Sequence, residues 1–178
     1  DADGVAITAT ELTDIQGSTS GVITVSNAVN ITGTADQAIA ALHTPATKVT
    51  AASAVVTLSD DPNLTKLINL NNATTGAIKI FERGTVFTGT AADLAAALSG
   101  TVTDNDGNAL NGAITITGDN PTLAQLRTIN DGTEGTITLP NAAEAFSGSA
   151  SDIAAALSGG SFTADVTITG ANPTPAEL

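Results

Sequence analysis

The sequence predicts an α/β solenoid, a fold in which parallel strands stack on one another and short helices cover the stack. Three observations predict it: long stretches of the chain recur, β-branched residues alternate before the expected helices, and the expected helix starts carry capping signals. The segment "TGTAADLAAALSG" at 88–100 returns as "SGSASDIAAALSG" at 147–159 and, more loosely, as "TGTADQAIAALHT" at 32–44.

A second unit recurs between these copies, as "DDPNLTKLINLNNATTGAIKI" at 60–80 and "GDNPTLAQLRTINDGTEGTITL" at 118–139. Pro62 and Pro121 lie 59 positions apart, and Pro121 and Pro173 lie 52 apart. We therefore expect units of 52–59 residues, each made of two strand–helix half-repeats of about 26–28 residues, a length typical of solenoid coils.

The domain prediction is a single repeat array over 1–178. Its parts are repeats at 5–53, 54–112 and 113–164 and a partial repeat at 165–178. We expect the chain to be a processed product or a piece of something longer, since it lacks an initiating Met. The alternative architecture is a string of small α+β modules of about 55 residues, each with a marginal core.

The first half of each unit opens on a strand, predicted at 114–117 and 166–169 from its alternation of aliphatic residues with Thr. An acidic or amide residue before proline then predicts a helix start, with the first residue as N-cap and proline at the first helical position. Leucines three residues apart follow, and a second strand is expected at 78–80 and 137–139. The expected helix starts are Asp61–Pro62, Asn120–Pro121 and Asn172–Pro173.

The second half of each unit begins with a glycine turn, at Gly33, Gly89 and Gly148. Capping boxes follow, and the helices are rich in alanine, which lets them pack close to a neighbouring backbone. Gly100 and Gly159 are expected to terminate two of these helices. The predicted boxes pair Thr34 with Gln37, Thr90 with Asp93 and Ser149 with Asp152.

Composition limits what the chain does. Hydrophobic residues make up 42% but aromatic residues only 2%, which predicts a thin, regular core. A formal net charge of −13 disfavours nucleic acid as a partner, and no segment has the length of a membrane-spanning helix. Cys and Met are both absent, so no disulfide is expected and oxidation-prone sulfur is excluded. We expect an extracellular or cell-surface location, with a virion appendage as the alternative.

The candidate metal site lies in "TDNDGNALNG" at 103–112. Asp104, Asp106 and Asn108 alternate oxygen ligands around Gly107, as in the first half of a calcium loop. No acidic residue follows to close the coordination shell, and an ordinary Asx turn is the favoured alternative. We expect the chain to require no cofactor, with calcium as the one candidate.

No residue is predicted to be catalytic. His43 follows the expected helix at 35–42 and is interpreted as a surface or C-cap residue, because the other copies supply no partner for it. The sequence contains no nucleophile elbow or phosphate-binding loop. The outward Thr pairs of the strands indicate either plain β-propensity or a flat ladder of the ice-binding kind. These pairs are Thr115/Thr117, Thr136/Thr138 and Thr167/Thr169.

The pattern "NPTLAQLR" with "INDGTEGTITL", followed by "FSGSASDIAAALSG", resembles the Thr-, Ala- and Asp-rich repeats of very large secreted or surface proteins of marine bacteria, particularly cyanobacteria. The resemblance implies a stalk, filament or adhesive array outside the cell. We therefore expect a non-enzymatic structural protein that stacks end to end, with itself, head to tail, or with further repeats of a longer chain as partner. The alternative is a surface-binding module that presents its Thr, Ser and Asp face to glycan, mineral or ice.

Overall fold

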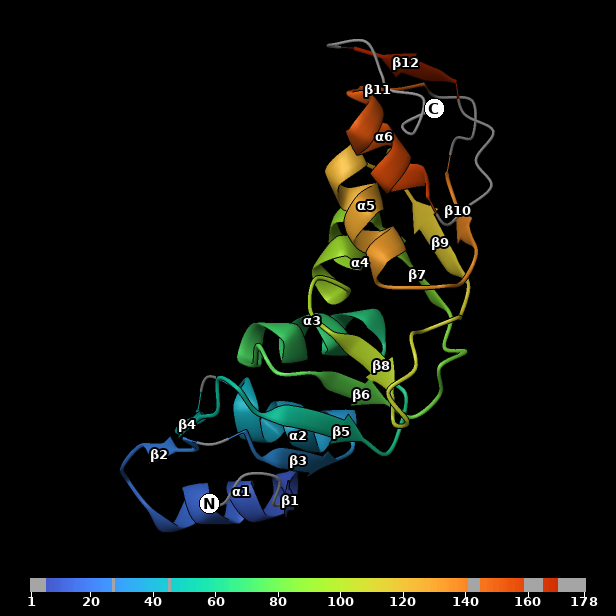
Figure 1. Ribbon diagram of the computed structural model, residues 1–178. Coiled ribbons are helices and arrows are strands. Elements are labelled where there is room, and N and C mark those ends of the chain that lie inside the picture. The colour runs from blue at the N-terminus through green and yellow to red at the C-terminus, as the bar shows by residue number, and fades with distance from the viewer. Residues whose placement is uncertain (1–5, 27, 45, 141–144, 159–164, 170–178) are drawn as a thin grey trace. The chain divides into compact units, whose positions relative to one another are not determined.

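The protein is an α/β protein of parallel strands and short helices (Figure 1). The computed structural model describes residues 6–26, 28–44, 46–140, 145–158 and 165–169. The chain divides into two compact units. Unit 1 comprises Asp1–Arg83 with Gly100–Leu110, and unit 2 comprises Gly84–Ser99 with Asn111–Leu178.

Unit 1 is built on a five-stranded sheet in which every neighbouring pair of strands is parallel, in the order β1-β3-β5-β6-β8. Its Cα partners are 22 to 25 residues apart in the chain, as for Asn30 with Val55 and Val56 with Ile78. Each strand therefore lies beside the strand of the next strand–helix segment. The strands are β1 (Ala6–Thr8), β3 (Asn30–Gly33), β5 (Val55–Leu58), β6 (Ile78–Ile80) and β8 (Val102–Asp104).

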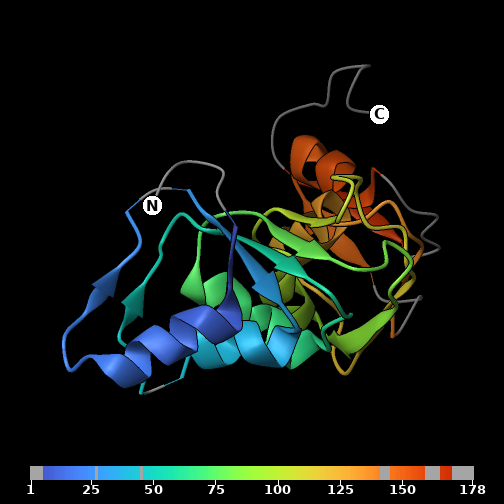
Figure 2. The same cartoon turned by 90° about the horizontal axis from the view of Figure 1, so that it is seen from below.

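Three helices of unit 1 pack on one side of this sheet, as Figure 2 shows for α1 and α2. They are α1 (Ala9–Ser18), α2 (Ala35–Leu42) and α3 (Leu64–Ala73). The core between helices and strands is aliphatic, and Leu67 and Leu70 of α3 are fully buried, as the spacing of the leucines predicted. A second parallel pair joins β2 (Ile23–Thr24) to β4 (Val49–Thr50).

Unit 2 has the same kind of arrangement, with two smaller sheets. The first has the order β10-β9-β7 and the second pairs β11 with β12, all in parallel. The predicted strand at 114–117 is confirmed, with Ile114 and Ile116 buried on its inner face. The elements are β7 (Phe87–Thr90), α4 (Ala91–Ala97), β9 (Ile114–Thr117), α5 (Leu123–Asp131), β10 (Ile137–Thr138), β11 (Phe146–Gly148), α6 (Ala150–Leu157) and β12 (Val166–Ile168).

The predicted start of the helices after proline was wrong by two residues. The N-caps are Asn63 and Thr122, which follow the prolines, rather than Asp61 and Asn120. The reason is a better cap: Thr122 accepts a hydrogen bond from the Gln125 N–H at 3.2 Å, and the Gln125 side chain accepts one from the Thr122 N–H at 2.9 Å. The third predicted start, Asn172–Pro173, lies outside the described residues.

Of the predicted capping boxes, the one between Thr34 and Gln37 is confirmed with both of its bonds. Thr90 and Ser149 are confirmed as N-caps that accept from the N–H groups of Asp93 and Asp152. The sequence did not predict that a strand precedes each of these caps. The glycines that were expected to form turns lie instead within the strands β3, β7 and β11. Gly100 was also wrongly placed: α4 ends at Ala97 with Leu98 as its C-cap, two residues before Gly100. Gly159 lies outside the described residues.

Candidate functional site

A turn of sequence Thr-x-Gly lies between a helix and the next strand at three places in the described residues. In unit 1 this turn is Thr74–Gly76, between α3 and β6. Thr74 is 4% exposed, and its hydroxyl donates a hydrogen bond of 2.7 Å to the carbonyl of Ala54, at the start of β5. The same hydroxyl accepts a bond of 3.0 Å from the Gly76 N–H. One buried side chain thus satisfies backbone groups of two adjacent segments.

Position 76 requires a glycine because of a close contact with a neighbouring backbone, and not because of its φ angle. A Cβ on Gly76 would overlap the carbonyl oxygen of Ala54, so the two backbones touch directly. Unit 2 repeats the contact at Thr133–Gly135, between α5 and β10: Thr133 is buried and accepts a bond of 2.9 Å from the Gly135 N–H. A Cβ on Gly135 would overlap the carbonyl oxygen of Gly112.

A third copy of the turn, Thr19–Gly21, lies between α1 and β2 and differs in its surroundings. Thr19 accepts a bond of 3.1 Å from the Gly21 N–H, as in the other copies. Thr19 is exposed, however, and the nearest atom that a Cβ on Gly21 would meet among the described residues is the Thr19 Oγ1, at 3.6 Å. Within the described residues, this copy has the turn without a preceding backbone packed on it.

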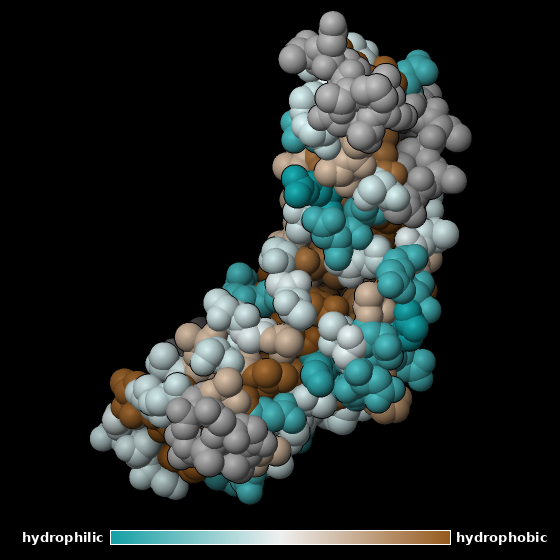
Figure 3. All heavy atoms as spheres, in the orientation of Figure 1, coloured by the Kyte–Doolittle hydropathy of each residue, from teal (hydrophilic) through white to brown (hydrophobic). Residues whose placement is uncertain are grey.

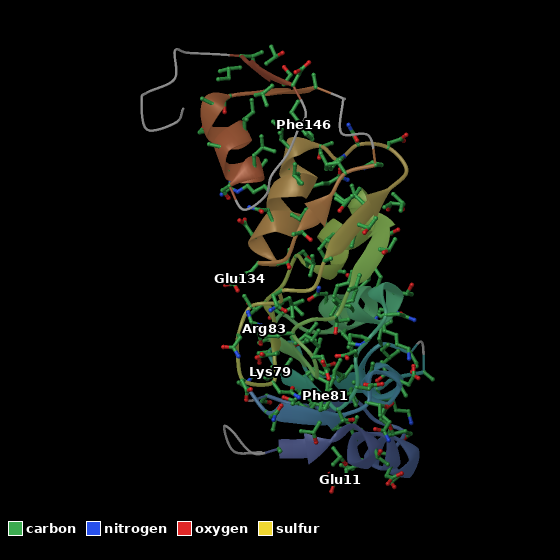
Figure 4. All side chains as sticks on the ribbon, turned by 90° about the vertical axis from the view of Figure 1, so that its right-hand side faces the viewer. Glu11, Lys79, Phe81, Arg83, Glu134 and Phe146 are labelled. Atoms are coloured by element: carbon green, nitrogen blue, oxygen red, sulfur yellow. The ribbon has the colours of Figure 1, made fainter. Side chains whose placement is uncertain are left out.

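An apolar hollow of about 580 Å³ lies beside α1 in unit 1. Ile15 in its wall is 44% exposed, and Figure 3 shows hydrophobic residues at the surface of unit 1. Glu11, labelled in Figure 4, is one of its lining residues, and hydrogen bonds from the Thr8 N–H and hydroxyl lower the pKa of the Glu11 carboxyl. The hollow is lined by Ala6, Ile7, Glu11, Asp14, Ile15, Val25 and Val29.

The outward face of the unit 1 sheet carries a ladder of hydroxyls. The Cα partners pair Thr8 with Thr32 and Thr32 with Thr57, and then Lys79 interrupts the ladder before Thr103. Figure 4 shows Lys79 on the strand side of the unit, away from the helices. Neighbouring strands lie about 4.8 Å apart, so these side chains form one row at that spacing.

Unit 2 carries a similar row, in which Thr88 pairs with Thr115 and Thr115 with Thr138. Strand β7 belongs to the second half of one predicted repeat, and β9 and β10 belong to the first half of the next. Strands of both kinds of half therefore pair in one sheet, a point that the sequence left open. Of the predicted pairs, Thr115 and Thr117 both lie in β9, whereas β10 begins after Thr136 and β12 ends before Thr169. Thr167 pairs with Ser147.

The calcium candidate is a hydrogen-bonded turn at the end of β8. Asp104 is 6% exposed, and its Oδ1 accepts bonds from the backbone N–H groups of Asp106 at 3.0 Å and Asn108 at 2.8 Å. Its Oδ2 accepts a bond of 2.9 Å from the Asn108 side-chain amide. Gly107 has a φ of +87°, which the tight turn requires. The structure brings Asp104 and Asn108 into contact, and Asp106 joins them through its backbone.

Through these bonds the Asp104 carboxylate stabilises the turn at 104–108. The hydrogen bond from the Asn108 side-chain amide is the main cause of the lowered pKa of Asp104. Burial partly opposes this shift, whereas the backbone N–H groups and the charge of Arg83 act in the same direction as the amide. Within the part of the chain that the structure describes, no three His, Cys, Asp or Glu side chains are grouped to hold a metal ion.

His43 is the C-cap residue of α2, as predicted, and its N–H donates a bond of 2.9 Å to the Ile39 carbonyl. The residue is half-buried and lies at the end of the helix.

The described helices include none that is long and apolar enough to cross a membrane.

The Thr-x-Gly contact was missed in the sequence. Its signal was present, because "TSG", "TTG" and "TEG" precede "VI", "AI" and "TI" in three copies.

Comparison of the chain with models of protein families, with curated proteins and with solved structures found no match in any of the three.

Proposed function

We propose that this chain is an extracellular structural repeat protein whose strand–helix segments are the coils of an α/β solenoid, stacking end to end into a rigid stalk or filament. The observation that carries the proposal is the Thr-x-Gly contact. It joins successive segments through backbone atoms, in both units, and it is supported by parallel strand registers that advance by one segment at a time. Such contacts extend an array in one direction.

The proposal accounts for two further properties. Every buried residue of α3 and β5 is aliphatic, which suits thin layers that repeat rather than one deep core. The absence of Cys and Met suits an exposed, oxidising setting, where thiols and thioethers are vulnerable. The role is non-enzymatic, and the partner is a further copy of the same repeat, either in another chain or in the same one.

Electron microscopy of the purified chain, with calcium and with a chelator, tests this function. We expect thin filaments or rods whose width is that of one segment. Filaments in calcium that disperse in chelator would add a metal role at the Asp104 turn. Compact particles that never associate, in either condition and at any concentration, would contradict the proposal.

A second candidate function is favoured by the outward hydroxyl rows. Thr88, Thr115 and Thr138 in unit 2 would present a regular polar face to glycan, mineral or ice. Their replacement by Val, which keeps β-propensity, separates the two functions. Loss of binding to such a surface with assembly unchanged would favour the binding module, and loss of neither would leave the rows as ordinary solvent-facing strand residues.

A further inference from the structure

We propose that the outward face of the β10-β9-β7 sheet in unit 2 binds ice. The inference deepens the second candidate function given above, because it names one surface and the side chains that meet it, and it does not depend on end-to-end stacking. This surface, the threonine face, has three rows: Val86, Ala113 and Thr136; Thr88, Thr115 and Thr138; and Thr90, Thr117 and Pro140.

The strand register sets these rows. Phe87, Ile114 and Ile137 are Cα partners and are all buried, so the residues on either side of each of them lie on the opposite, outward face. The register extends one position before them, because the Phe87 N–H donates to the Ala113 carbonyl at 3.2 Å and the Ile114 N–H donates to the Thr136 carbonyl at 2.8 Å. Helices α4 and α5 lie on the inner side of the three strands, as Figure 1 shows.

The threonine face is open to solvent and carries no charge of its own. Its nine positions all belong to the described residues, none of them is ionisable, and six are threonines. Thr115 at the centre is half-buried, the other five threonines are exposed, and Val86 is 62% exposed. Thr90 marks one edge, since its hydroxyl caps α4 by accepting from the Asp93 N–H at 3.2 Å. The face therefore presents methyl and hydroxyl groups together.

The spacing of these groups suits an ordered layer of water. Neighbours in a row lie about 4.8 Å apart, and successive rows lie about 6.6 Å apart, the length of two residues along a parallel strand. Equivalent oxygen atoms on a prism face of hexagonal ice repeat in two perpendicular directions at distances close to these. Each hydroxyl holds a water through a hydrogen bond, and each methyl orders the water beside it. Water on this face is thus arranged in two dimensions as it is in the crystal.

The same face fits the other candidate surfaces less well. Mineral cations are held by carboxylate and carbonyl oxygens, and the threonine face has no carboxylate among its nine side chains. Small organic molecules such as sugars bind in concave sites lined by apolar and aromatic side chains, whereas this is a sheet surface without an aromatic residue. The row of unit 1 differs, because Lys79 interrupts it with a strongly hydrated ammonium group.

The test places a lysine at either end of the central row. Thr88→Lys and Thr138→Lys introduce a long, hydrated side chain at exposed strand positions, where it extends into solvent without disturbing the core. Thr24→Lys is the matched control, since Thr24 is also an exposed strand threonine but lies in β2 of unit 1. Circular dichroism and thermal unfolding verify that each variant is folded.

Partition into slowly growing ice provides the readout, with amino-acid analysis of the ice and of the remaining liquid. We expect the wild type and Thr24→Lys to enter the ice, and Thr88→Lys and Thr138→Lys to stay in the liquid. Equal partition of the wild type and both face variants would overturn the threonine face as the site. A wild type that stays in the liquid would overturn ice binding itself.

Two further measurements separate this outcome from the alternatives. Sedimentation velocity on the same samples reports association, so a wild type that forms oligomers but is left out of the ice would leave the structural function standing. Wild-type binding to calcium carbonate powder or to microcrystalline cellulose, lost in both face variants and without entry into ice, would overturn ice as the partner and assign the face to that surface.

Discussion

At the residue scale, the buried threonines of the Thr-x-Gly turns join neighbouring segments through hydrogen bonds to the main chain. Thr74 donates to the Ala54 carbonyl and accepts from the Gly76 N–H, and it is almost wholly buried. A hydroxyl in this position has no water to replace its partners, so its loss leaves polar backbone groups without hydrogen bonds.

Replacement of Thr74 by Val is therefore expected to lower the free energy of unfolding by about 1–3 kcal/mol, the cost of leaving buried polar groups unsatisfied. Urea unfolding measures the change. Thr75→Val is the matched control: Thr75 is exposed, and although its hydroxyl donates to the Ala52 carbonyl at 2.9 Å, the change should stay within about 0.5 kcal/mol. Equal losses at the two positions would contradict the role given to Thr74.

The Asp104 turn makes a prediction about pH. The pKa of Asp104 is lowered in the folded protein, mainly by the Asn108 amide, so the carboxylate stabilises the fold above the ordinary Asp value of about 3.9. That contribution is lost as the pH falls from this value through the lowered pKa. Asp104→Ala should lower the thermal midpoint at pH 7 and flatten its fall as the pH drops below about 4.

Asp106→Asn is the control for this pH experiment. Asp106 is exposed and reaches Asp104 through its backbone N–H, which the substitution keeps. Its melting profile should follow that of the wild type. If the thermal midpoint of Asp104→Ala falls with acidic pH as steeply as that of the wild type, other carboxyls cause the loss of stability. Glu11 is one of them, since its bonds with Thr8 also lower its pKa.

At the element scale, helix α2 is held at its first turn by side chains from two segments. The N-terminus of α2 is capped by its own Thr34, which accepts from the Gln37 N–H at 3.3 Å. It is also capped from the next segment, because the Asp60 carboxylate accepts from the Ala35 N–H at 2.7 Å. The acidic pair Asp60 and Asp61 thus serves neighbouring elements, since Asp61 accepts from the Glu82 N–H at 2.8 Å.

Removal of either cap of α2 should cost about 1 kcal/mol, the usual loss at a helix N-cap. Thr34→Ala and Asp60→Ala are the two variants, and Thr34→Ser is the control that keeps an acceptor oxygen. Urea unfolding provides the measurement. A loss with Thr34→Ala and none with Asp60→Ala would mean that the helix is capped from within its own segment alone.

The caps also show what could be predicted from the sequence. Periodicity and capping signals located the helices of both halves and the strand at 114–117, because such signals act over a few residues. The strands β3, β7 and β11 were missed because each is short and contains the glycine that was expected to form a turn.

Other features depend on contacts between distant parts of the chain. The helix start predicted at Asp61 failed because Asn63 provides the cap, and Asp60 and Asp61 instead bind backbone that is 21 to 25 residues away, which no local pattern reveals. The acidic loop at Asp104 was recognised as a calcium candidate from its composition. Its burial and its bonds to its own backbone are tertiary information, and they favour the Asx turn that was the alternative.

At the scale of the whole molecule, charge opposes the end-to-end association proposed above. Eighteen acidic residues face five basic ones, so two copies that approach end to end repel one another. Screening weakens that repulsion, since the Debye length falls from about 30 Å at 0.01 M salt to about 8 Å at 0.15 M.

Self-association of the wild type should therefore strengthen as sodium chloride is raised across this range. Light scattering at fixed protein concentration measures the change. Oligomers that dissociate as salt is raised would indicate that attraction between charges holds the copies together, contrary to the end-to-end stacking proposed above.

The contact between glycine and a carbonyl oxygen also bears on how such a chain changes over generations. The contact joins a glycine to a main-chain oxygen of the preceding segment, so it places little demand on that segment's side chains provided that the glycine is kept. Gly112 makes the same contact with the carbonyl oxygen of Thr85 although the residue two positions before it is Leu110. Whole segments can then be duplicated or deleted without a new interface being invented. Length becomes a variable that mutation adjusts in steps, and outward residues are free to diverge.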